Sequence, residues 1–163
     1  MINPVTGEIA FGNGLRILPH CAVSSLSTAL QKPVNVRSQK LSLGDWKRYV
    51  LGTHPSEHGS FQVEALSADD DCIHVVLLSH QHPFYEAGTP DDAERRAFHE
   101  GVINSDLAGQ REFTWGEVIC RLEMSGKRDW LVIAYNRQPR VPFTEKTVLL
   151  RLCAHERPAD DNP

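Results

Sequence analysis

The middle of the chain alternates apolar and polar residues, which predicts paired β-strands. Phe61, Val63 and Ala65 alternate with polar residues, and the run CIHVVLL (72–78) follows after a polar stretch. A run that is apolar on both faces is typical of a strand covered on both sides, so we place it in the middle of a sheet. Residues 60–80 are therefore expected to form a hairpin that turns at 68–71.

Three further segments carry strand patterns. Residues 114–136 alternate on both sides of the turn Ser125-Gly126-Lys127-Arg128, which predicts a second hairpin. Residues 8–18 surround Asn13-Gly14, the strongest two-residue hairpin signal, because both residues tolerate positive φ. Residues 34–54 are strand-like, with a break expected at Gly44-Asp45.

Helical spacing is clearest in 88–109. Thr89 is a suitable cap, Pro90 suits the first turn, and Gly109 suits the C-terminal end. Two weaker helices are expected in 19–33 and 144–155. The fold class predicted is α+β, an antiparallel β-sheet meander with two or three helices packed against it.

One domain is expected over 1–157, followed by a frayed C-terminal tail at 158–163. The apolar faces of the predicted elements indicate a core. It includes Phe98, Val102, Trp115, Val118, Leu122 and Leu131.

Composition narrows the class of protein. With 40% apolar and 23% charged residues, the chain is typical of a globular protein. The net charge of −4 provides no basic surface for nucleic acid. No secretory signal and no membrane-spanning apolar run is found, so we expect a cytoplasmic protein without a membrane partner. Its cysteines form no CxxC pair and are expected to be free thiols; they are Cys21, Cys72, Cys120 and Cys153.

The stretch SHQHPF (79–84) places His80 and His82 two residues apart, a spacing that can serve a metal ion. A zinc site needs three or four ligands, however. Metal-dependent hydrolases with such a pair usually have an aspartate and a histidine shortly after it, whereas the residues that follow here are Pro83, Phe84, Tyr85 and Glu86. We therefore interpret the pair as strand-end histidines and expect no metal and no cofactor.

Other catalytic patterns are weak. There is no Gly-x-Ser-x-Gly elbow and no phosphate-binding loop, and Cys21 beside His20 lacks a recognisable partner. Asp69-Asp70-Asp71 lacks the spacing of a calcium loop and is interpreted as a solvated turn. Glu94-Arg95-Arg96 and Glu100 are expected on the wet face of the long helix. We predict no catalytic residue.

Three segments together resemble one family of bacterial proteins. They are GLRILPHCAVSSLSTAL, WKRYVLGTHPSEHGSFQVEAL and FTWGEVICRLEMSGKRDWLVIAY, in which Phe113, Trp115 and Gly116 match an F-x-WG-x-V strand. His20 stands where these proteins have a glycine. The chain is similar to small cytoplasmic immunity proteins of polymorphic toxins and type VI secretion effectors.

This resemblance implies a non-catalytic protein that binds and neutralises one cognate toxin. Because toxins that act on nucleic acid tend to be basic, we expect acidic loops to make the contact. The candidate contact residues are Asp69, Asp70, Asp71, Glu86, Asp91 and Asp92.

Two other classes of function stay open from the sequence. One is a small metal-binding protein or hydrolase that uses His80 and His82. The other is a structural subunit of an assembly.

Overall fold

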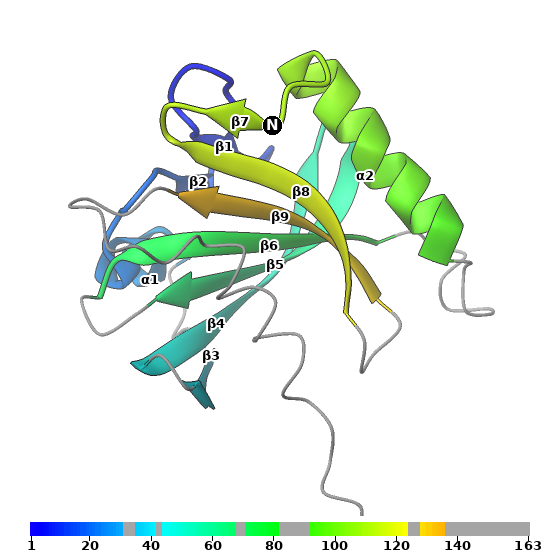
Figure 1. The fold of residues 1–163 in the computed structure, drawn as a ribbon. Helices are drawn as coiled ribbons and strands as arrows, with labels where there is room; N and C mark the ends of the chain where they lie inside the picture. The colour runs from blue at the N-terminus through cyan, green and yellow to red at the C-terminus, as the bar shows by residue number, and fades with distance from the viewer. Residues whose placement is uncertain (31–34, 42–43, 68–70, 82–91, 124–127, 136–163) are drawn as a thin grey trace, which may run out of the picture.

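The computed structural model describes residues 1–30, 35–41, 44–67, 71–81, 92–123 and 128–135. Its largest element is a seven-stranded antiparallel sheet with the order β3-β4-β5-β6-β9-β8-β7 (Figure 1). The strands are β3 (Asn35–Leu41), β4 (Gly44–Ser56), β5 (Gly59–Ser67), β6 (Ile73–Gln81), β7 (Glu112–Phe113), β8 (Gly116–Glu123) and β9 (Arg128–Tyr135).

Two meanders build this sheet. Strands β3 to β6 follow one another as neighbours, and the chain then passes through helix α2 (Asp92–Leu107) to the far edge. It returns through β7, β8 and β9, and β9 pairs with β6 in antiparallel orientation. Strand β6 is therefore the fourth of seven, which confirms the prediction that CIHVVLL lies in the middle of the sheet.

Both faces of the central strands are buried, because their side chains alternate between two apolar clusters. Along β9, Leu131, Ile133 and Tyr135 join the larger cluster, and the residues between them join a smaller one. The smaller cluster consists of Leu66, Val75, Leu77, Trp130, Val132 and Ala134. A strand in the middle of a sheet that is covered on both sides needs apolar residues on both of its faces.

The helices and an N-terminal hairpin cover one face of the sheet (Figure 1). The hairpin pairs β1 (Ile9–Ala10) with β2 (Arg16–Ile17), and Gly14 in its turn has φ of 87°. The buried apolar residues of α1 (Val23–Leu30), α2 and the hairpin belong to the larger cluster. The architecture is thus α+β, with helices packed on a mostly antiparallel sheet.

The hairpins predicted at 8–18, 60–80 and 114–136 and the helices predicted at 19–33 and 88–109 are present, whereas Thr89 and Pro90, the expected start of α2, lie outside the described residues. Gly109, with φ of 77°, follows the end of α2 as expected of a C-terminal cap. The break expected at Gly44-Asp45 is present two residues earlier: β3 ends at Leu41 and β4 begins at Gly44, so Gly44 and Asp45 pair with Leu41 and Lys40 across a hairpin. The helix predicted at 144–155 and the tail 158–163 lie outside the described residues.

The predicted core is confirmed in part. Val102, Val118 and Leu131 are buried, whereas Phe98 and Trp115 are only half-buried against the core. The side chain of Leu122 lies outside the described part of the chain. Arg95 corrects the prediction of a wet helix face, because only 9% of it is exposed.

An N-terminal arm (residues 1–8) is held by the second half of the chain. The backbone N–H of Ile2 donates to Asp106 Oδ2 at 2.8 Å, and the Tyr135 hydroxyl donates to the carbonyl of Gly7 at 3.0 Å. The indole N–H of Trp115 donates to the carbonyl of Pro4 at 3.0 Å. The arm therefore closes the covered face of the sheet across long sequence separations.

The pair Trp115-Gly116 has a structural reason in this fold. Trp115 stacks on Phe113, with 4.6 Å between ring centroids, and its ring lies over Gly7. A Cβ at Gly116 would lie 2.0 Å from the carbonyl oxygen of Ala134 on the neighbouring strand. Only glycine allows β8 to approach β9 so closely at this position.

Candidate functional site

His80 lies in the core rather than in an open site. Only 3% of it is exposed, and its ring stacks on Phe98 with 3.5 Å between centroids and meets Phe61 edge-on. His82, the other member of the predicted pair, lies outside the described residues. The structure therefore gives His80 a packing environment of aromatic rings.

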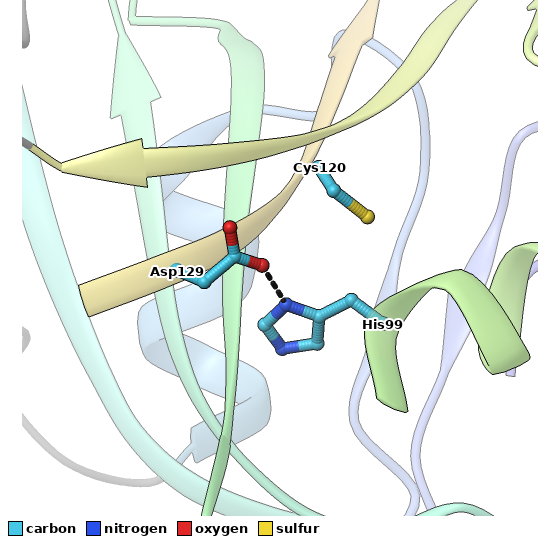
Figure 2. A group of neighbouring side chains, drawn as sticks. All are labelled: His99, Cys120 and Asp129. Atoms are coloured by element: carbon cyan, nitrogen blue, oxygen red, sulfur yellow. Dashed lines mark hydrogen bonds and ion pairs between the residues drawn. The ribbon is translucent and has the colours of Figure 1, made fainter. Parts of the chain in front are cut away.

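A buried histidine that the sequence did not single out lies beside it. His99 on α2 is fully buried, and its Nδ1 lies 2.7 Å from Oδ2 of the buried Asp129 on β9 (Figure 2). Its Nε2 accepts the backbone N–H of His80 at 3.1 Å. Because Nε2 is an acceptor, the ring is neutral with its proton on Nδ1, and Nδ1–H donates to Asp129.

Strand register explains why His99 takes this place. The β6–β9 pairing runs from Val75 opposite Ala134 to Leu78 opposite Leu131. Continued by two residues, the same register would set His80 opposite Asp129. There the His99 ring joins the His80 backbone to the Asp129 carboxylate, so α2 is connected to both strands.

Cys120 on β8 completes a group of three potential ligand residues. Its Sγ, an Asp129 oxygen and a His99 ring nitrogen lie within 4.8 Å of one another, and the three side chains converge in Figure 2. Burial raises the pKa of the Cys120 thiol to about 12, and the carboxylates of Glu100 and Asp129 add to this effect. The thiol is therefore protonated at neutral pH.

This group contains the residue types of a cysteine triad without its geometry. In such a triad, the histidine nitrogen opposite the carboxylate accepts the thiol proton. Here Nε2 of His99 accepts a backbone N–H instead, and a thiol with a raised pKa is a poor nucleophile. The group is suited to hold three elements together.

A second group lies at the surface end of α2. Glu57 and His58 from the β4–β5 turn meet Asp106 of α2, and their ligand atoms also lie within 4.8 Å of one another. His58 Nε2 lies 2.6 Å from Asp106 Oδ1. Glu57 is exposed, whereas His58 and Asp106 are half-buried.

Of the acidic contact candidates, Asp71 is the one whose side chain the structure describes. It is exposed, with φ of 56°, between β5 and β6. Asp92 begins α2, but its side chain is outside the described part. Asp69, Asp70, Glu86 and Asp91 lie outside the described residues.

Neither group could be found from spacing along the chain. His99 and Asp129 are 30 residues apart, and His58 and Asp106 are 48 apart. The members come from different strands and helices, so only the folded register brings them together.

Comparison of the chain with protein-family models, curated proteins and solved structures finds no match. Among the described residues, no helix combines the length and the apolarity needed to cross a membrane.

Proposed function

We propose that this chain is a non-catalytic immunity-type protein that binds and neutralises a cognate bacterial toxin. The observation that carries the proposal is Asp71, an exposed carboxylate on a locked backbone. The resemblance of three segments to immunity proteins supplies the class of partner.

Two hydrogen bonds fix the backbone around Asp71. Its carbonyl accepts the N–H of Val23 at 3.0 Å, and the N–H of Ile73 donates to the carbonyl of Cys21 at 3.0 Å. Ala22 and Cys72 form an antiparallel bridge between them. The start of α1 thus holds Asp71 in its left-handed conformation.

A locked acidic residue suits a protein that binds a basic partner. Ordering a contact residue on binding costs free energy, and a residue whose backbone is already held, as that of Asp71 is, avoids that cost. Complementary charge also speeds the encounter of two proteins, and more so at low ionic strength. Asp71 is accordingly the residue at which we expect the charge of this surface to matter.

The buried group of His99, Cys120 and Asp129 supports binding over catalysis. Both nitrogens of His99 are engaged inside the protein, and the thiol of Cys120 keeps its proton. These residues stabilise the packing of α2 on the sheet, which is the rigid scaffold that a binding surface needs.

The test begins with co-expression of the protein in a sensitive strain with each toxin encoded beside its gene. One toxin should be neutralised and should co-purify, with an interface of about 1,200–2,000 Å² in the complex. If no neighbouring toxin is neutralised or co-purifies, the proposal is wrong.

Substitution of Asp71 by Asn then tests the surface. Asn tolerates positive φ, so the backbone is retained while the charge is lost. We expect the association rate to fall several-fold at low salt and less at high salt. The matched control is Glu112→Gln, which removes one exposed charge from β7. Equal effects of the two variants would exclude Asp71 as a contact residue.

A further inference from the structure

The group of Glu57, His58 and Asp106 is unrelated to the acidic surface proposed above. Its two nearest members are His58 and Asp106, whose Nε2 and Oδ1 atoms are 2.6 Å apart. Oε1 of Glu57 lies 3.8 Å from the same nitrogen. One imidazole and two carboxylates therefore face a common point.

The turn that carries Glu57 and His58 is held by its own hydrogen bonds. The Ser56 hydroxyl donates to the carbonyl of Gly59 at 2.9 Å and accepts the N–H of His58 at 3.1 Å. Positive φ, which is 100° here, falls on Gly59 directly after the two turn residues, as in hairpins that a G1 bulge closes. The turn is thus ordered before any ligand binds.

Asp106 occupies an electrostatically unfavourable position. It lies in the last turn of α2, where the helix dipole is negative and no basic residue is present. Only 7% of its side chain is exposed. A carboxylate at such a position needs positive charge or hydrogen-bond donors nearby.

The chain already places positive charge there. The α-ammonium group of Met1 contacts Glu57 and lies 3.5 Å from Asp106 Oδ2. Two carboxylates face this one ammonium, so one formal negative charge is left over when His58 is neutral. The group therefore attracts a further cation.

We propose that Glu57, His58 and Asp106 form a surface site for a divalent transition-metal ion, with zinc as the representative. Zinc binds imidazole nitrogen and carboxylate oxygen at about 2.0–2.2 Å, so tetrahedral ligand atoms lie roughly 3.3 Å apart. The 2.6 Å and 3.8 Å separations at His58 bracket this value and need movements of less than about 1 Å. The imidazole ligand disfavours calcium and magnesium, which take oxygen ligands.

The buried group around His99 is the less suitable metal site. A metal on Nδ1 of His99 would leave Nε2 to carry the ring proton, which would then face the N–H of His80. Two of its members, His99 and Asp129, are also buried and Cys120 is partly buried, whereas Glu57 is open to solvent. The surface group has neither obstacle.

Calorimetric titration of the chelator-treated protein with zinc tests the site. We expect one equivalent to bind, and His58→Gln and Glu57→Gln each to weaken binding at least about tenfold, since loss of even an outer-shell partner of a ligand costs that much. His20→Asn is the matched control, because His20 packs against His74 and Tyr135 instead and Asn tolerates its φ of 56°. Unchanged zinc affinity in both site variants would overturn the proposal.

Two further measurements distinguish zinc binding at this surface site from binding at the group that contains Cys120. Zinc should raise the melting temperature of the native chain but not of His58→Gln, and magnesium and calcium should have no effect. Cobalt should bind without a thiolate charge-transfer band. A strong thiolate band, or loss of binding in Cys120→Ser, would place the metal on the buried group and overturn the assignment. The side chain of Glu57 is 64% exposed, so Glu57→Gln should leave the fold intact. This variant therefore tests zinc binding even if His58→Gln unfolds.

Discussion

At the scale of single residues, Gly7 is a position where a neighbouring side chain leaves no room for a Cβ atom. It has φ of 72°, and a Cβ there would lie 2.6 Å from the ring of Trp115. Gly14 has a similar φ of 87°, but a Cβ there would meet nothing within 4 Å. The two glycines therefore share a backbone requirement and differ in their surroundings.

Replacement of each glycine by alanine separates these two effects. Gly14→Ala should lower the free energy of unfolding by about 1–2 kcal/mol, the cost of the left-handed conformation. Gly7→Ala should cost more by at least about 1 kcal/mol, because overpacking against Trp115 adds to the same backbone cost. Denaturant unfolding measures both values. Equal losses would mean that the Trp115 ring moves aside freely.

At the scale of secondary-structure elements, His99 shows how a helix is fixed to a sheet. The ring joins α2 to the backbone of β6 and to Asp129 of β9, in a region where each partner is buried. Buried polar groups cost free energy when they are left unpaired. His99 therefore adds a polar connection to the apolar contacts that Val102, Ile103 and Leu107 make between the helix and the sheet.

His99→Phe should destabilise the protein by about 2–6 kcal/mol, since the His80 N–H and the Asp129 carboxylate each lose a partner worth about 1–3 kcal/mol. Asp129→Asn is the matched control, because the amide oxygen still accepts from Nδ1 and should cost less. Thermal or chemical unfolding gives both values. A loss below about 1 kcal/mol in His99→Phe would show that water replaces the ring.

The elements were more predictable from the sequence than the groups of side chains. The alternation at Phe61, Val63 and Ala65 indicates directly that these residues share one buried face of a strand. The pair Asn13-Gly14 indicates a hairpin because of its backbone preference. His99 and Asp129 carry no such local signal. Their contact follows from the pairing of β6 with β9, and that pairing depends on the route of the chain through α2 and β8.

The prediction that Arg95 lies on the exposed face of its helix is wrong. A charged triplet on an amphipathic helix predicts solvent exposure, but Arg95 is buried while its neighbours Glu94 and Arg96 are exposed. The burial of Arg95 extends to its guanidinium Nε, so it reflects how α2 packs in the folded protein, which sequence periodicity does not register.

At the scale of the whole molecule, the N-terminal arm determines how the chain closes. Its hydrogen bonds with Asp106, Trp115 and Tyr135 join residues 104 to 128 positions apart. Closing loops of this length is entropically costly, so such contacts are expected to form late in folding.

Tyr135→Phe tests this order of events. It removes the hydroxyl that donates to Gly7 and should destabilise by about 1–3 kcal/mol, because a buried carbonyl loses its partner. If the arm docks after the transition state, the unfolding rate rises and the folding rate is unchanged. Leu131→Ala, in the middle of the sheet, is the comparison and should slow folding. Slower folding of Tyr135→Phe in stopped-flow experiments would place the arm in the nucleus.

The same arm has a consequence for synthesis on the ribosome. Gly7 and its hydroxyl donor are separated by 128 positions, so at about 5–20 residues per second Gly7 waits roughly 6–25 s for Tyr135 to be made. During that time Ile2, Ile9 and Phe11, which are buried in the finished protein, lack β9 and for much of it β8, without which the sheet that covers them is incomplete. The arm is thus translated long before its partners and is among the last parts to be folded, and until Tyr135 is made the nascent chain presents the apolar residues of the arm to chaperones.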